Sequence, residues 1–185
     1  MNTPITIPEV RNITVSGHAA SGATTLSKAL GEKLGWQVIN GGEIYREYAR
    51  KNGIPLEQTG QSSDEYHLQL DNFIKEKLKK EKNLIVESWL SGFDAKNIEG
   101  VFKIFVTCSD DSLRAKRIVK RDKMSLEKAI IHLKTREGEN LKKWDKLYHS
   151  REFWNPKIYN IVIDTYKTNP TETLNLALVA LGVTG

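Results

Sequence analysis

The segment "GHAASGATT", residues 17–25, has the glycine spacing of a phosphate-binding loop. It follows the apolar stretch "NITVS" and precedes a helical pattern, which is the context that the motif G-x-x-x-x-G-K-[ST] requires. The glycines let backbone amides turn toward phosphate oxygens, and the start of the following helix adds partial positive charge. The hydroxyl of Thr24 suits a magnesium ion. Eight residues form the predicted phosphate-binding set: Gly17, Ala19, Ala20, Ser21, Gly22, Ala23, Thr24 and Thr25.

One position departs from this motif, because Ala23 stands where the pattern has lysine. Loss of one preorganised cationic donor typically lowers the rate of phosphoryl transfer by ~10²–10³. Three explanations stay open: a cation from elsewhere, such as Lys28, takes over; the protein binds without chemistry; or alanine was introduced to hold a complex. A simpler alternative is a strand-turn-helix connection in which the glycines serve only the turn.

An arginine follows the second apolar segment, in the stretch "GGEIYREYARKNG", residues 41–53. We expect a glycine turn there and then a helix that carries Arg46 about one turn in. A guanidinium group can hold a phosphate through two hydrogen bonds, so Arg46 is a candidate anion ligand. The alternative is an exposed arginine paired with Glu43 or Glu47.

Positive charge is concentrated between Leu113 and Lys146, where 12 basic residues face 5 acidic ones. The segment therefore carries a charge of +7, and the rest of the chain, with 16 basic and 18 acidic residues, carries −2, which together give the net charge of +5. Arg114, Arg117 and Arg121 recur at spacings that share one helical face. We expect another helix to begin at Arg136. A solvated helical surface would show the same pattern.

The elements that must position these residues alternate along the chain. Five short, mostly β-branched segments read as strands covered on both faces: "NITVSG", "WQVIN", "NLIVES", "VFKIFVTC" and "YNIVIDT". Helical patterns lie between them, among them residues 24–34, and residues 66–80 with Leu70, Phe73, Ile74 and Leu78 on one face. Asn169, Pro170 and Glu172 have the spacing of a capping box for a last helix. This alternation predicts an α/β fold with a parallel sheet.

The length of 185 residues suits one domain, and the composition is that of a folded chain. No stretch approaches the roughly 20 apolar residues of a membrane helix, so no membrane partner is expected. The start "MNTPITIPEV" lacks the features of a secretory signal, and the single Cys108 excludes an internal disulfide. We therefore expect a cytoplasmic protein of unknown oligomeric state. No zinc, RNP-type or helix-turn-helix pattern supports the alternative of nucleic-acid binding through the basic segment.

Taken together, these stretches resemble the nucleoside monophosphate kinases, and most closely the cytidylate kinase family in its short archaeal-type form. The resemblance covers nearly the whole chain and includes "INGGEIYREYARKNG", "LRAKRIVKRDKMSLEKAI", "TREGENLKKWDKLY" and "YNIVIDT". It implies a P-loop NTPase-type three-layer α/β/α fold with a five-stranded parallel sheet and a helical lid. Within one domain, the core would be residues 1–109 and 151–185, the acceptor-binding helices about 42–81 and the lid about 110–150.

The same resemblance implies ATP with magnesium as the phosphoryl donor, held through Thr24, and CMP or dCMP as the acceptor. Arg46 would bind the acceptor phosphate, and Arg117, Arg121 and Arg136 would act catalytically by closing over the transferring group. Glu87, at the end of the third strand, would support the magnesium shell through water or orient the acceptor. An exposed acid at a strand terminus is the alternative for Glu87.

A second departure from the family pattern is Trp89 in "VESWLSGF", where the family has an arginine. Its ring either fills the core or covers a base. Two functions therefore remain: a phosphotransferase of the (d)CMP kinase type, weakened by Ala23, and a catalytically inactive nucleotide-binding regulator of the same fold.

Overall fold

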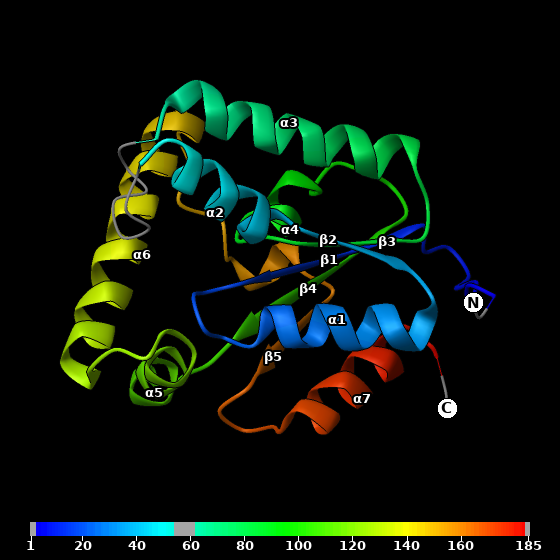
Figure 1. Ribbon diagram of the computed structural model, residues 1–185. Helices are drawn as coiled ribbons and strands as arrows, with labels where there is room; N and C mark the ends of the chain where they lie inside the picture. Colours follow the sequence, from blue (N-terminus) through cyan, green and yellow to red (C-terminus); the bar gives the residue numbers. More distant parts are fainter. Residues whose placement is uncertain (1–2, 54–61, 184–185) are drawn as a thin grey trace.

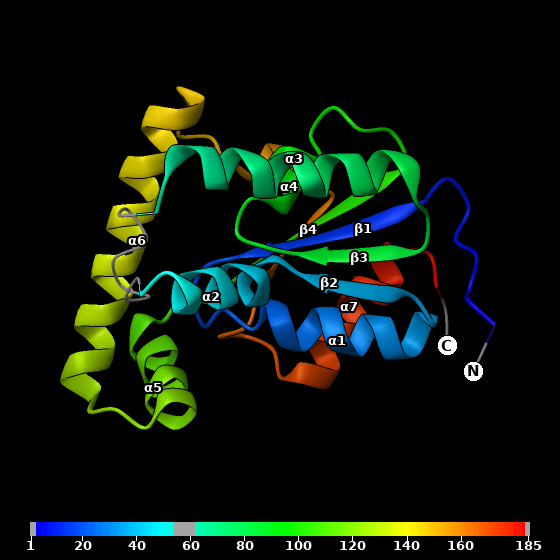
Figure 2. The same cartoon turned by 45° about the horizontal axis from the view of Figure 1, so that its top comes forward.

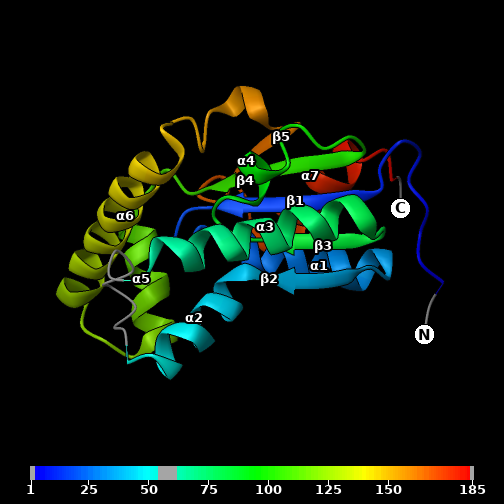
Figure 3. The ribbon, with the colours of Figure 1, turned by 90° about the horizontal axis from the view of Figure 1, so that it is seen from above.

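The computed structural model describes residues 3–53 and 62–183, and within them strands and helices alternate. All five segments predicted as strands are strands. Their bounds are β1 Asn12–Gly17, β2 Gln37–Asn40, β3 Leu84–Glu87, β4 Val101–Thr107 and β5 Ile161–Asp164. They form one parallel sheet in the order β2-β3-β1-β4-β5. The first strand thus lies in the middle of the sheet, between β3 and β4 (Figure 3), and each of its residues is buried.

Helices cover both faces of this sheet, which confirms the predicted three-layer α/β/α fold. Their bounds are α1 Ala23–Leu34, α2 Gly41–Lys51, α3 Asp64–Lys80, α4 Ser91–Asp94, α5 Asp111–Asp122, α6 Leu126–Tyr148 and α7 Pro170–Ala180. Helices α1 and α7 lie on one face, and α3 and α4 lie on the other (Figure 1). Among the described residues, none of the helices is long and apolar enough to cross a membrane.

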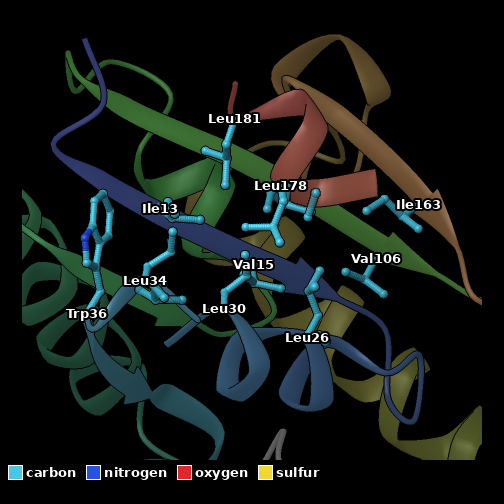
Figure 4. Packing of buried hydrophobic residues seen from close by; sticks show 14 of the residues in the cluster. Ile13, Val15, Leu26, Leu30, Leu34, Trp36, Val106, Ile163, Leu178 and Leu181 are labelled. Atoms are coloured by element: carbon cyan, nitrogen blue, oxygen red, sulfur yellow. The ribbon is translucent and has the colours of Figure 1, made fainter. Parts of the chain in front are cut away.

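The main core forms because α1 repeats leucine at every fourth position, which places the leucines on one face. Leu26, Leu30 and Leu34 pack with Ile13 and Val15 of β1 (Figure 4). All five side chains are almost fully buried. Burying one such side chain contributes about 1.5–3 kcal/mol, so this face of α1 fixes the helix against the central strand.

A smaller core lies under α3, where Ile74 and Leu78 pack with Leu84 and Val86 of β3. Phe73 was expected on the same face as these residues, but 44% of it is exposed. That prediction is wrong because Phe73 directly precedes Ile74, and its ring turns away from the sheet.

The last helix begins as predicted. Asn169 caps α7 by accepting a hydrogen bond from the backbone N–H of Glu172 at 3.0 Å. The Glu172 carboxylate accepts from the backbone N–H of Asn169 at 2.8 Å, which completes the capping box. Pro170 occupies the first turn, where no helical hydrogen bond is lost.

Helices α5 and α6 lie beyond the carboxyl ends of the strands, away from both chain ends (Figures 2 and 3). Ser125 caps α6, and the helix then runs unbroken to Tyr148. Arg136 therefore lies within α6, and the expectation that it begins a helix is wrong. Toward its end α6 contacts the chain just before α3 and the middle of α3: Lys143 Nζ donates to the backbone oxygen of Ser62 at 2.7 Å, and Tyr148 donates to Asp71.

Candidate active site

The loop after β1 has the backbone geometry that its glycines suggested. Gly22 has a φ of 104°, in the left-handed region that favours glycine, and it precedes the first residue of α1. At Gly17 an added Cβ would lie 2.5 Å from Ser21 Oγ and 2.7 Å from the backbone oxygen of Val106. A side chain at either position would therefore distort the loop. Ala20 also has a positive φ, 58°, which is uncommon for a residue with a Cβ.

A cavity of about 1030 Å³ joins this loop to α2 and to the basic helices. The predicted site residues come from five separate stretches of sequence, and all of them except Gly17 line it. They are Ala19, Ala20, Ser21, Gly22, Ala23, Thr24, Thr25, Arg46, Glu87, Arg117, Arg121 and Arg136. Sequence reasoning missed several further lining residues, including Lys120, Thr165 and Thr168. The fold therefore gathers the predicted phosphate-binding loop and the predicted arginines around one space.

Glu87 and Thr24 both line the cavity and form a hydrogen bond with each other. The hydroxyl of Thr24 donates to Glu87 Oε2 at 3.3 Å, and Glu87 is only 6% exposed. The alternative of an exposed acid is therefore wrong. Burial raises the pKa of Glu87 to about 7, although the hydrogen bond from Thr24 and the charge of Arg46 oppose the shift.

This pair of oxygen-bearing groups fits a magnesium ion. Mg²⁺ prefers oxygen ligands and usually takes one or two carboxylates beside substrate phosphates and water. No group of three or more His, Cys, Asp or Glu residues that could hold a metal occurs in residues 3–53 and 62–183. Thr24 and Glu87 therefore suit a metal that arrives with a phosphate chain.

Arg136 presents a buried guanidinium group to the cavity. It is 8% exposed, and its Nε has no hydrogen-bond partner among the described residues. Its Cζ lies 5.0 Å from the centre of the Trp89 ring. Burial lowers the pKa of Arg136 to about 10, and the nearby charges of Arg121 and Arg46 add to this effect. Three like charges around one cavity favour an anion there.

Arg46 and Arg121 are more exposed than Arg136 and have local partners. Arg46 Nη2 lies 4.0 Å from Glu43 Oε1, and Arg121 makes two hydrogen bonds of 2.7 Å to Asp122. The expected glycine turn before Arg46 is wrong. Asn40 caps α2 through the backbone N–H of Glu43 at 2.8 Å, so both glycines belong to the first turn of the helix.

Arg117 holds the loop itself. Its Nη1 donates to the backbone oxygens of Ala20 at 3.0 Å and Ser21 at 3.2 Å. It also donates to the hydroxyl of Thr165 at 2.9 Å, while Nη2 donates to the Thr165 backbone oxygen at 3.1 Å. The guanidinium group therefore binds protein oxygens instead of extending freely into the cavity, which the spacing of the arginines did not indicate.

Arg114 was not among the predicted site residues, yet it also binds the loop. It is buried, its Nε donates to the backbone oxygen of Ala19 at 3.0 Å, and its Nη2 pairs with Glu137 of α6. His18 lies nearby, with its ring 4.1 Å from that of Trp154 and Nδ1 3.6 Å from Glu137 Oε1. The sequence spacing of Arg114, Arg117 and Arg121 indicated that they share one face of a helix. The contacts of Arg114 and Arg117 with the loop could not be predicted, because they depend on the tertiary fold.

A second cavity of about 70 Å³ lies between α2, α3 and α6 and shares Gly42, Trp89 and Arg136 with the first. The buried Asp71 lines it, and burial raises the pKa of this carboxyl to about 6 against the opposing hydrogen bond from Tyr148. The sequence gave no indication of this cavity, because its lining comes from helices that only tertiary packing brings together.

A five-stranded parallel sheet with a phosphate-type loop at its carboxyl edge, faced by a cluster of arginines, defines a P-loop phosphotransferase fold. The family model for an AAA domain matches residues 13–146. A gluconokinase from Sinorhizobium meliloti has a similar structure, with a TM-score of 0.62 at 17% sequence identity over 94% of this chain and 93% of that chain. At that level of identity the likeness shows the shared fold.

Two curated relatives indicate which family of phosphotransferases the chain belongs to. A cytidylate kinase of Archaeoglobus fulgidus is 36% identical over 158 residues, which cover 83% of this chain and 79% of the relative. A cytidylate kinase of Pyrococcus horikoshii is 33% identical over 172 residues, which cover 91% and 87%. The chain belongs to the cytidylate kinase family and is a phosphotransferase of that type.

Proposed function

We propose that this protein transfers the γ-phosphoryl group of ATP to a nucleoside monophosphate, CMP or dCMP. The observation that carries the proposal is the single cavity that places the loop of residues 17–25 opposite Arg46, Arg121 and Arg136. Phosphoryl transfer requires mainly positioning and positive charge around the migrating group, and this cavity offers both. The names of the relatives from Archaeoglobus and Pyrococcus support the choice of acceptor.

Each region of the cavity has a role in this proposal. Backbone amides of residues 18–25 bind the ATP phosphates, apart from that of Ser21, which donates to the backbone oxygen of His18 at 3.1 Å. Arg46 binds the acceptor phosphate. Arg121 and Arg136 stabilise charge on the transferring group. Arg117 contributes by fixing the loop through the carbonyl groups of residues 20 and 21.

Thr24 and Glu87 would hold magnesium that accompanies ATP. Bound magnesium offsets negative charge on the β- and γ-phosphates. The raised pKa of Glu87 means that its carboxyl is partly protonated near neutral pH, so an arriving cation favours loss of that proton. Glu87 and Thr24 then differ in role: the carboxylate of Glu87 supplies negative charge to the magnesium ion, and the hydroxyl of Thr24 orients the ion.

We further propose that Ala23 stands in the place of the lysine of other P-loop kinases, which weakens catalysis without abolishing nucleotide binding. Lys28 lies on the exposed side of α1, whereas Lys120 lines the cavity with the arginines. The backbone amides of the loop do not depend on the side chain at residue 23. We expect turnover to be ~10²–10³ lower than with a lysine at this position.

The test is phosphoryl transfer from magnesium-ATP to each nucleoside monophosphate, with the wild-type chain and with Ala23→Lys. The proposal predicts CMP or dCMP as the preferred acceptor and a large gain in kcat for Ala23→Lys. Ser27→Ala would serve as a matched control on α1, since the hydroxyl of Ser27 donates to the backbone oxygen of Thr24, within its own helix, at 3.0 Å. Background activity in both proteins with every monophosphate would refute the enzymatic proposal.

The second candidate function is a catalytically inactive nucleotide-binding regulator. Ala23 favours it, and so do the protein partners that Arg117 and Arg121 already have. Calorimetry would then show ATP binding, while chromatography would show no ADP after long incubation with CMP. Turnover that disappears in Arg136→Met would exclude the regulator.

The division of the chain follows from the same proposal. We propose one domain with a core of residues 1–109 and 151–185 and a lid of residues 110–150. The acceptor-binding region of about 42–81 is proposed as well, although its residues 54–61 lie outside the described part of the chain. The proposed partners are nucleotides, and the cytoplasmic location stays a prediction.

A further inference from the structure

The ring of Trp89 is held in place on several sides. It lies edge-on to Trp144 of α6, with centroids 5.5 Å apart and planes at 75°. Trp154 lies 6.1 Å away and donates a hydrogen bond of 3.1 Å from Nε1 to the backbone oxygen of Trp89. Contacts of this kind stabilise an aromatic group beyond its burial. Trp89 therefore offers a ring of fixed position where the two cavities meet.

The guanidinium group of Arg136 lies over this ring. Among the described residues Arg136 forms no close ion pair: Asp122 and Glu87 attract it only from a greater distance, while Arg121 and Arg46 repel it. A buried cation in this situation is normally costly. The face of an indole ring attracts a cation and is most effective where water is excluded. Trp89 therefore compensates for part of the cost of burying Arg136.

The kind of partner matters for what Arg136 can still bind. A carboxylate would take up guanidinium N–H donors, whereas a ring face leaves the donors in the plane of the guanidinium group available. The unpartnered Nε of Arg136 agrees with this arrangement. Two more buried polar atoms without a partner among the described residues, Tyr45 Oη and Ser88 Oγ, belong to residues that line the smaller cavity. The guanidinium group of Arg136 at the junction can therefore bind an anion, and polar groups of the smaller cavity beside it are without protein partners among the described residues.

We propose that Trp89 is a positioning residue that holds the guanidinium group of Arg136 at the junction of the two cavities, where it contacts the phosphate of the acceptor nucleotide as well as the transferring group. The inference rests on the proposed function, since it takes the acceptor to be a monophosphate. Trp89 acts through Arg136 and makes no direct contact with the phosphate. Arg46, which lines only the larger cavity, binds the same group from the side of α2.

The test compares CMP with cytidine, because the two ligands differ only in the phosphate. Dissociation constants are measured by calorimetry for the wild type, Trp89→Phe and Trp89→Leu. We expect Trp89→Leu to weaken CMP binding about 10- to 30-fold, the effect of losing a desolvated cation–π contact, with cytidine binding unchanged. Trp89→Phe keeps a ring face, so its affinity for CMP should be intermediate.

A double-mutant cycle separates positioning from simple packing. In an Arg136→Met background, Trp89→Leu should cause no further loss of CMP affinity, since the group that Trp89 positions is gone. Trp36→Phe is the matched tryptophan control, because Trp36 lies in the main core with its Nε1 bonded to the Ile5 backbone oxygen at 2.8 Å. Its CMP affinity should equal that of the wild type.

A proton NMR measurement reads the geometry without any ligand. The Hε resonance of Arg136 should be shifted upfield by the ring current of Trp89 in the wild type and should lose that shift in Trp89→Leu. Equal losses of CMP and cytidine affinity, or a full further loss in the Arg136→Met background, would overturn the proposal. So would a wild-type protein that does not bind CMP. Absence of phosphoryl transfer alone would refute the proposed function and leave these binding measurements readable.

Discussion

Replacing Glu87 by glutamine should stabilise the protein at alkaline pH, although the same change is expected to impair magnesium-dependent turnover. The reason is that burial raises the pKa of Glu87 from its ordinary value of 4.5 to about 7. Between these values the folded protein binds more protons at this site than the unfolded chain. Stability therefore falls as pH rises through this window, and the full penalty is present above pH 7.

The size of the effect follows from the shift. The difference between 4.5 and about 7 corresponds to at most about 3.5 kcal/mol, since a tenfold change in proton affinity is worth about 1.4 kcal/mol. Glutamine resembles the protonated carboxyl at every pH and can still accept the hydrogen bond from Thr24. The gain in the free energy of unfolding for Glu87→Gln should thus be small at pH 4.5 and reach about 3 kcal/mol at pH 8.

Urea denaturation at a series of pH values would measure this gain as the difference between variant and wild type. Glu76→Gln is a suitable control, because hydrogen bonding to Lys80 lowers the pKa of Glu76. The Glu76→Gln variant should therefore become less stable than the wild type as pH rises, whereas Glu87→Gln should become more stable than the wild type. A difference for Glu87→Gln that stays constant with pH, or that is negative at pH 8, would refute the reasoning.

Three further predictions concern the loop, the α7 cap and Arg114. Gly17→Ala should lower Tm and abolish ATP binding in calorimetry, since the loop has no room for the added Cβ. Gly138→Ala is the matched control: the added Cβ would lie in open space on α6, so this variant should raise the free energy of unfolding by about 0.5–1 kcal/mol. Asn169→Ala should cost about 1 kcal/mol in urea denaturation through loss of the α7 cap; an unchanged midpoint would contradict this. Arg114→Met should raise KM for ATP more than KM for the acceptor, because it frees the backbone oxygen of Ala19; equal changes would argue against a role in holding the loop.

The sequence was sufficient for the strands and for the loop. Continuous apolar segments and the spacing of Gly17 and Gly22 are local signals, and the backbone geometry at both glycines agrees with them. The capping box at Asn169 is local as well, and its two hydrogen bonds are present. Arginine spacing correctly indicated a shared helical face, because helical periodicity alone determines it.

The partners of those arginines could not be predicted in the same way. Arg114 and Arg117 bind loop carbonyl groups nearly one hundred residues earlier in the chain, and Arg136 lies over the ring of Trp89, in the connection between β3 and α4. Such contacts depend on how α5 and α6 lie across the edge of the sheet. The burial of Glu87 was missed for the same reason, since the side chains that cover it come from separate elements.

Helix α6 contacts both sides of the proposed active site, and this has a thermodynamic consequence. Near its middle Glu137 pairs with Arg114, which bonds the loop, and near its end Tyr148 bonds Asp71 of α3. If α6 moves as one body to admit one nucleotide, its contacts on the other side change as well. Linkage requires such an effect to be reciprocal: if bound donor changes the affinity for acceptor by some factor, bound acceptor changes the affinity for donor by the same factor.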